Sequence, residues 1–224
     1  MKPHIPHLLG LNAGFVDTAG FLALQGLFTA HVTGNFVTLG AALIQGSSGV
    51  LAKLLALPVF CTIIVITRLC TVAMRQQGRA PLRAMMIAKL ALLTLGAVLA
   101  IHFGPFQHGD SVQAVVTGMV LVSAMAIQNA LSRIHLSASP PTTLMTGSTT
   151  QMMIDIADLL RRVDAEAATA ARARLRKIGP VVASFALGCA LGATLFHFTS
   201  VWCFALPPLL ALVTAVEALV LPED

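Results

Sequence analysis

The amino-acid sequence predicts an all-α, polytopic membrane protein that forms a single transmembrane domain over residues 1–224. Hydrophobic residues make up 57% of the chain and charged residues 10%, whereas soluble domains average about 45–50% and about 25%. Several apolar runs approach or exceed the ~20 residues that a bilayer-spanning helix needs. The basic residues gather in particular connections between these runs. Together these observations favour a bilayer-embedded bundle over a soluble helical core.

Six segments are long and apolar enough to span a bilayer. They are residues 8–28, 51–74, 84–103, 112–134, 179–198 and 200–221. The first segment carries Asp17 and lacks a small-residue cleavage site, so we expect a retained helix instead of a signal peptide. Two shorter stretches, 32–46 and 143–158, each begin near a Thr-Gly pair and are too short for a comfortable crossing.

The positions of the basic residues distinguish six crossings from eight. They lie between the second and third segments, at the end of the fourth and before the fifth: Arg75, Arg79, Arg83, Arg133, Arg161, Arg162, Arg172, Arg174, Arg176 and Lys177. The connections at 29–31, 104–111 and 197–200 contain no Lys or Arg. Six crossings with a cytoplasmic N-terminus place every basic connection in the cytoplasm, as the positive-inside rule requires. We therefore expect six spans with both termini in the cytoplasm.

The two short stretches then have to enter and leave the membrane on one side. We expect residues 29–50 to re-enter from outside and residues 139–160 from the cytoplasm, and such irregular backbone usually lines a cavity. Residues 163–177 read as a short amphipathic cytoplasmic connector, which either binds anionic headgroups or is simply solvated. Lys53 and Lys89 lie near the ends of their segments, where a long side chain is expected to snorkel to water.

A weak internal repeat relates the two halves, about 8–103 and 112–221. "VTGNFVTLG" begins at Val32 and "MTGSTTQMM" begins at Met145, and each follows a helix with polar residues inside it. Three spans per half force the halves into opposite orientations, so the sequence predicts an inverted repeat of the kind found in transporters. Chance similarity between apolar sequences is the alternative.

The two Thr-Gly breaks predict a polar site near the membrane midplane. Helix N-termini there would offer free N–H groups and positive dipole ends to an anion or a polar oxygen. Gly34 and Gly147 are expected to allow close approach or positive φ. We expect both breaks to line one cavity, with these substrate-binding candidates: Asp17, His31, Thr33, Gly34, Asn35, Gln128, Asn129, Thr146, Gly147 and Ser148. The alternative is that these residues only cap buried helices.

Asp17 and His31 are the two titratable candidates. A charged side chain at mid-membrane costs about 2.5–3.5 kcal/mol, so Asp17 should face the interior and have a partner. Proton or cation coupling and a fixed hydrogen bond to the Thr-Gly loop are both open for Asp17. His31, which titrates near neutral pH, is either a gate or a cap.

One motif resembles a known family. "GFVDTAGFLALQGLFTAHVTGNFVTLG", from Gly14, is similar to the signature of the YoaK-like family, domain of unknown function 1275. "IQNALSRIHLSASPPTTLMTGSTTQ", from Ile127, resembles the second conserved segment of that family, including Thr142 and Thr143, with Ser148 in place of the usual Asn or Thr. The resemblance implies a multi-spanning protein of the bacterial inner membrane that transports a small molecule, and it supplies no substrate.

The leading hypothesis is a transporter or channel for a small polar solute, with anions among the candidates. The alternative is a membrane-embedded sensor or scaffold without transport activity. The sequence holds no nucleophile elbow, zinc signature or phosphate loop, so we predict neither enzyme activity nor a metal or cofactor. A net charge of +5 is too small and scattered for nucleic-acid binding. The expected partners are the lipid bilayer and the solute, and the small six-helix body is compatible with a homodimer.

Overall fold

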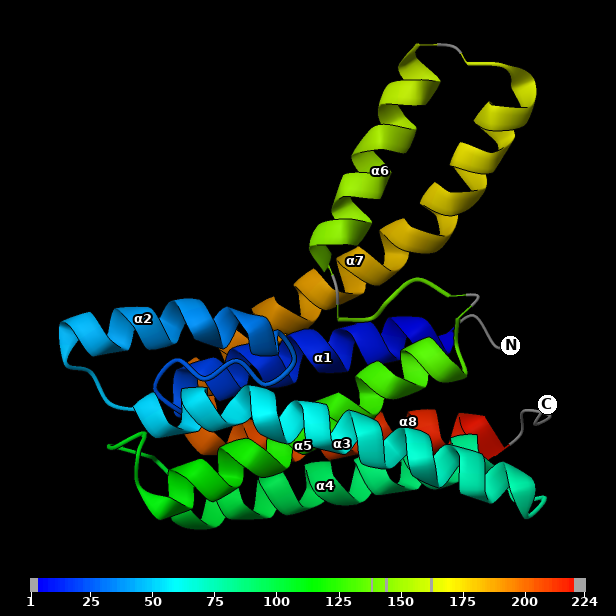
Figure 1. The fold of residues 1–224 in the computed structure, drawn as a ribbon. Coiled ribbons are helices and arrows are strands. Elements are labelled where there is room, and N and C mark those ends of the chain that lie inside the picture. The colour runs from blue at the N-terminus through cyan, green and yellow to red at the C-terminus, as the bar shows by residue number, and fades with distance from the viewer. Residues whose placement is uncertain (1–3, 138, 144, 162, 220–224) are drawn as a thin grey trace.

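The computed structural model describes residues 4–137, 139–143, 145–161 and 163–219, and these residues are all-α (Figure 1). The α-helices and the two 3-10 turns, marked η, are α1 His4–Ala23, η1 Val32–Gly34, α2 Asn35–Gln45, α3 Val50–Gln76, α4 Pro81–Phe103, α5 Val112–Ile134, α6 Met145–Leu160, α7 Ala165–Thr199, η2 Ser200–Ala205 and α8 Leu206–Leu219. Within this part of the chain, four stretches are long and apolar enough to cross a membrane: Val50–Gln76, Pro81–Phe103, Val112–Ile134 and Ala165–Ala218. The chain is therefore a multi-pass membrane protein by helix length and hydropathy.

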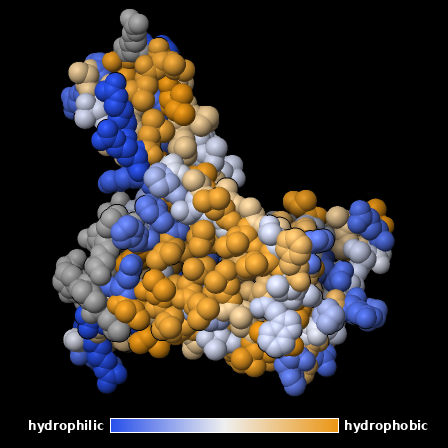
Figure 2. Space-filling model, turned by 180° about the vertical axis from the view of Figure 1, so that it is seen from behind, coloured by the Kyte–Doolittle hydropathy of each residue, from blue (hydrophilic) through white to orange (hydrophobic). Residues whose placement is uncertain are grey.

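The body is a bundle in which α1, α3, α4, α5, α8 and the second half of α7 run side by side, with both ends of the chain at one end of the bundle (Figure 1). Seen from behind, the body carries a broad hydrophobic surface with hydrophilic residues gathered at its two ends (Figure 2). That distribution suits a bilayer around the middle of the body. α1 is buried along most of its length and packs closely on α7, where a side chain at Gly192 would come within 2.8 Å of the Phe15 carbonyl oxygen.

The first helix ends earlier than the expected boundary at residue 28. α1 stops at Ala23 because Gln25 and Gly26 adopt positive φ angles of 54° and 84°, which turn the chain back along α1. α2 then runs out to the end of the bundle at which α1 stops (Figure 1). There Lys53 Nζ donates to the carbonyl oxygens of Gln25 (2.7 Å) and Ser48 (3.2 Å). Lys53 is 5% exposed, so it ties two turns together instead of snorkelling.

The predicted connector at 163–177 is not a separate helix. Asp164 caps a single long helix, α7, by accepting a hydrogen bond from the Ala167 N–H (2.8 Å), and the helix continues through Pro180 to Thr199. The amphipathic pattern of 163–177 therefore describes the first half of this helix. Its apolar second half packs in the body beside α1.

α6 leaves the body, unlike α2, and pairs with the first half of α7 in a hairpin that projects sideways (Figure 1). We call α6 and residues 165–179 the arm. Asp155, on α6, is fully buried and accepts hydrogen bonds from Arg174 Nη2 (2.6 Å), Arg174 Nε (3.1 Å) and Gln151 Nε2 (3.0 Å). Because this ion pair joins α6 to α7, residues 145–160 do not run back along the bundle as a re-entrant helix.

Lys89 is fully buried on the face of α4 that packs into the bundle. Gly96, two turns away on the same face, lies against Leu121 of α5, and the antiparallel register therefore places Lys89 level with Gln128. Among the described residues, Lys89 Nζ has no hydrogen-bond partner. The expectation that Lys89 snorkels to water is wrong.

Candidate functional site

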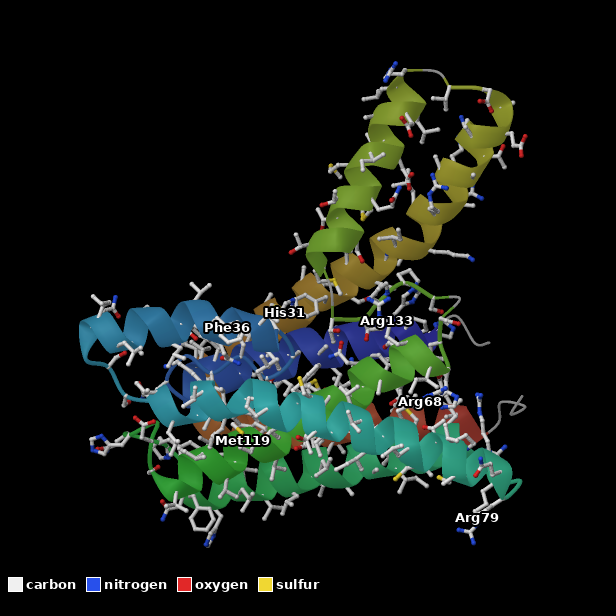
Figure 3. The ribbon with its side chains drawn as sticks, viewed as in Figure 1. His31, Phe36, Arg68, Arg79, Met119 and Arg133 are labelled. Carbon is white, nitrogen blue, oxygen red and sulfur yellow. The ribbon has the colours of Figure 1, made fainter. Side chains whose placement is uncertain are left out.

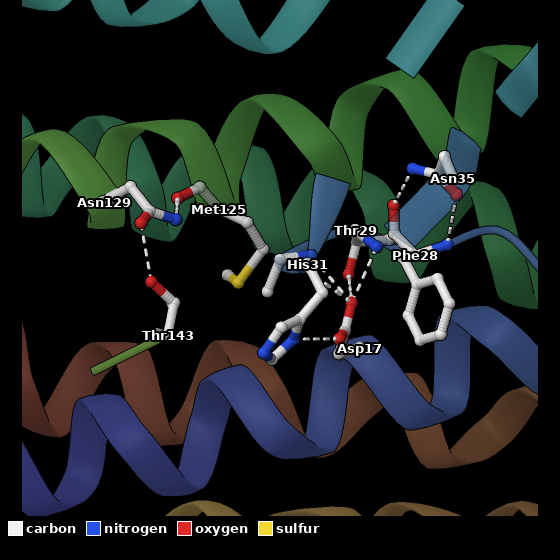
Figure 4. A network of polar contacts seen from close by, with 9 residues as sticks. Asp17, Phe28, Thr29, His31, Asn35, Met125, Asn129 and Thr143 are labelled. Carbon is white, nitrogen blue, oxygen red and sulfur yellow. Dashed lines mark hydrogen bonds and ion pairs between the residues drawn. The ribbon is translucent and has the colours of Figure 1, made fainter. Parts of the chain in front are cut away.

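The first Thr-Gly segment is held inside the bundle by Asp17, which is 4% exposed. Its Oδ1 accepts hydrogen bonds from the backbone N–H groups of Thr29 and Ala30, both at 2.7 Å, and from Thr29 Oγ1 at 3.3 Å (Figure 4). Backbone N–H groups at membrane depth need internal acceptors, and one carboxylate supplies them here. Asp17 therefore binds the returning loop of its own half of the chain.

His31 completes this arrangement from the other carboxylate oxygen. Its Nδ1 lies 2.7 Å from Asp17 Oδ2, and its ring packs edge-on against Phe185 of α7, with 5.3 Å between centroids. The side chain is 32% exposed. His31 thus links the loop, α1 and α7 at the edge of the buried cluster.

Asn35 also holds this loop, because its side-chain amide pairs with the backbone of Phe28 as another peptide group would. Its Oδ1 accepts from the Phe28 N–H (2.9 Å), and its Nδ2 donates to the Phe28 carbonyl oxygen (2.8 Å). Gly34 has an ordinary helical φ of −62°, but a side chain there would lie 3.0 Å from the Phe28 ring. Gly34 therefore allows close approach of the Phe28 ring, which is one of the two expected reasons for this glycine, and its φ is not positive.

A second polar cluster joins the last turns of α5 to the segment that follows it, where the chain also turns back. Thr143 Oγ1 donates to Asn129 Oδ1 (2.6 Å), and Gln128 Nε2 donates to the Leu9 carbonyl oxygen (2.8 Å) and to Thr142 Oγ1 (3.2 Å). Ser132 Oγ lies 3.1 Å from Thr142 Oγ1. The candidate set omitted Thr142, Thr143 and Ser132, although the motif that resembles the family contains both threonines.

The second Thr-Gly pair lies beyond this cluster, inside the first turn of α6. Outside its own helix, no described atom lies within 4 Å of a Cβ built at Gly147, and its φ is not positive, so neither reason given for that glycine holds. Ser148 is buried, with 7% of its surface exposed.

We call residues 24–34, which follow α1, the first loop. A pocket of about 490 Å³ lies between the first loop, α3 and α5. Its lining residues are Ala30, Val32, Thr33, Leu57, Phe60, Ile64, Arg68, Asn129, Ala130, Arg133 and Ile134. α3 begins at Val50, so Leu57 and Phe60, and with them the loop, lie roughly 10–15 Å along it. The pocket therefore extends from the first loop, deep in the bundle, toward Arg68 and Arg133, nearer the end that holds both termini (Figure 3).

The two Thr-Gly pairs do not line this pocket together. Thr33 belongs to it, but Thr146 lines a separate hollow of about 710 Å³ along α6 with Met145, Thr149, Thr150, Met153, Ile154 and Ala157. Of the other substrate-binding candidates, Asn129 alone lines the pocket that contains Thr33. In the two pockets described, the breaks line different hollows because α6 belongs to the arm, and the expectation of one cavity lined by both breaks stays a prediction.

The end of the pocket near Arg68 and Arg133 is positively charged. Neither guanidinium pairs with a carboxylate among the residues that the structure describes. The positive charge also affects His135, just beyond α5. Burial lowers the pKa of His135 most, and the charges of Arg75 and Arg68 lower this pKa further. A negatively charged group would be attracted to this end of the pocket.

A comparison with protein families matches residues 5–216 to the family described as "Protein of unknown function (DUF1275)". The matched region contains both polar clusters and every residue that lines the pocket. No curated protein and no solved structure matches the chain.

Proposed function

The chain belongs to the DUF1275 family, and for this member we propose transport of a small polar solute, an anion above all, through the pocket between α3 and α5. The observation that carries the proposal is a pocket that extends along α3 and α5 to a backbone loop partway along the bundle, where a buried carboxylate holds the loop. Irregular backbone at that depth is characteristic of lining elements in transporters and channels.

For the topology we propose six spans, α1, α3, α4, α5, α7 and α8, in the bacterial inner membrane. The bundle end that holds the termini also carries Arg79 and Arg133, and Arg75 lies there in the last turn of α3 (Figure 3). The turns at the opposite end, 46–49 and 104–111, contain no Lys or Arg. By the positive-inside rule both termini are cytoplasmic, and residues 24–45 re-enter from outside without crossing.

An inverted repeat is supported by how the helices pair. The first half comprises α1 to α4 and the second half α5 to α8. α1 packs on α7, and α5 packs on α3, so the first helix of each half pairs with the third helix of the other. In both halves the first helix is followed by a segment that turns back and binds its side chains, Asp17 in one and Asn129 in the other. The repeat breaks down at α2 and α6, since only α6 joins an arm.

The donors in the pocket suit an anion better than a cation. Thr33, Asn129, Arg68 and Arg133 can all present O–H or N–H groups to a bound solute. The carboxylate of Asp17 would repel an anion, but it lies outside the lining and is occupied by its backbone donors and His31. The same arrangement would reject a cation, because two guanidiniums without a carboxylate partner in the described part of the chain line the pocket.

The proposal is tested by flux into proteoliposomes that contain the purified full chain, with potassium salts of chloride, nitrate, lactate and phosphate as probes. Gly34→Leu should abolish flux because it displaces the Phe28 ring from the loop. Gly40→Leu is the matched control and should leave flux unchanged, because a Cβ at this position of the same helix meets no described atom outside its own helix within 4 Å. Wild-type flux no greater than that of empty liposomes would favour the sensor or scaffold alternative.

A further inference from the structure

The pocket has two kinds of lining at separate places. Leu57, Phe60, Ile64 and Arg68 recur at helical spacing, so they form one stripe along α3, about 16 Å long. The first three are apolar, and Ala130 and Ile134 add apolar surface from α5. The cationic groups, Arg68 and Arg133, come from both helices at one end.

This division constrains the ligand. A small hydrophilic anion could bind the guanidiniums but would leave the apolar stripe without a partner. A neutral apolar molecule would cover the stripe but would offer no acceptor to the two guanidiniums, which are hydrogen-bond donors only. An anion with an apolar body matches both parts, and Arg binds carboxylate and phosphate groups in bidentate geometry.

We propose that the pocket binds an amphipathic anion, with a carboxylate, sulfonate or phosphate head between Arg68 and Arg133 and an aliphatic or aromatic body along Leu57, Phe60 and Ile64. The inference rests on the proposed function, because it names the solute class of that same pocket. A volume of about 490 Å³ is within the ordinary range for small-molecule sites, about 300–1,000 Å³. The ligand could be a soluble amphiphile or an anionic lipid of the adjacent leaflet, since both present this chemistry.

Thr33 and Asn129 add a requirement at the deep part of the pocket. Asn129 is held by Thr143, which donates to its Oδ1, while its Nδ2 donates to the Met125 carbonyl oxygen at 3.1 Å. Asn129 therefore keeps one N–H for a ligand, and the Thr33 hydroxyl also lines the pocket. The apolar body of the ligand therefore lies along α3, these two residues can bind a polar atom at its far end, and charge recognition belongs to the arginines.

The test is binding of dansylaminoundecanoic acid to the full chain in phosphatidylcholine nanodiscs, with empty nanodiscs as the background. Saturable binding is expected, and the methyl ester of the probe should bind far more weakly. The double variant Arg68→Gln, Arg133→Gln should weaken binding about tenfold or more, because it removes charge-assisted hydrogen bonds. Arg79→Gln is the matched control, since Arg79 is exposed in the turn after α3, away from the pocket (Figure 3).

Competition distinguishes the two sources. Displacement of the probe by decanoate assigns a soluble amphiphile, displacement by phosphatidylglycerol in the nanodisc assigns a lipid, and displacement by neither overturns the proposal. Equal binding by the double arginine variant, or by the methyl ester, would also overturn it. Probe binding without flux of any anion would refute transport and leave this inference standing. Flux of small anions without probe binding would refute the inference and leave transport standing.

Discussion

At Asp17, a single carboxylate accepts hydrogen bonds from two backbone N–H groups and a hydroxyl in a region that a bilayer would surround. Its second oxygen binds His31. The sequence left two roles open for Asp17, coupling or a fixed hydrogen bond to the loop, and the geometry supplies the second. The same contacts explain why the irregular segment 24–34 can exist beside α1 without exposing its backbone to lipid.

Replacing Asp17 with Asn should destabilise the protein by about 1–3 kcal/mol, because the amide accepts fewer of these hydrogen bonds and leaves buried donors unsatisfied. Thermal unfolding in detergent measures the loss, with Asp158→Asn in the arm as the control. Unchanged stability together with an altered pH dependence of flux would instead assign Asp17 a coupling role.

Lys89 should be a cost to stability. Its amine is buried, and the described part of the chain offers it no hydrogen-bond acceptor. Lys89→Met keeps a similar volume and should leave the free energy of unfolding unchanged or raise it by about 1–4 kcal/mol. Chemical denaturation in detergent gives this difference, and a clear decrease would mean that the amine has a stabilising partner.

At the scale of elements, the sequence predicted where most of the helices lie, but neither where α1 ends nor that α6 and the first half of α7 form an arm. The central spans at 84–103 and 112–134 are within a few residues of α4 and α5 because apolar length and flanking charge determine them. The end of α1 depends on backbone turns at Gln25 and Gly26 that apolar letters do not reveal. The arm depends on the Asp155–Arg174 pair, and a contact between distant residues has no periodic signal in the sequence.

The arm should loosen in acid. The hydrogen bonds from Arg174 lower the pKa of Asp155 below its usual value of about 3.9. The pair's stabilisation is therefore complete above that pH and is lost as the pH falls through the lower, folded-state pKa. Hydrogen exchange in α6, corrected for intrinsic rates, should rise in acid in the wild type. In Asp155→Asn it should already be fast at pH 7, and equal exchange in both proteins at pH 7 would contradict this role.

At the scale of the whole molecule, the bundle presents an apolar surface between two polar ends (Figure 2). α1 is buried along most of its length although it carries Asp17, because the returning loop binds that carboxylate and Asn12 donates to the Pro207 carbonyl oxygen. The predicted number of crossings follows from charge placement alone. The placement of α6 outside the body could not be predicted from the same charges.

The proposed topology predicts opposite labelling of two turns. In a cysteine-free background, Ser47→Cys and His108→Cys should react with a membrane-impermeant reagent from outside, and Gln77→Cys only from inside. These residues are exposed, whereas a side chain at Gly109 would lie 2.8 Å from Gly49 Cα and report poorly. Labelling of Ser47→Cys from inside alone would refute re-entry from the outer face.

The central claim is that the first loop lines a ligand pocket that opens toward the arginines. Thr33→Cys tests it most directly, because Thr33 lies in the pocket while its segment re-enters from the opposite face. The account predicts that a small, water-soluble thiol reagent modifies this cysteine from the cytoplasmic side and that dansylaminoundecanoic acid slows the reaction. A Thr33→Cys protein that inserts normally but stays unreactive from the cytoplasm, or reacts at the same rate with the probe bound, would contradict the account.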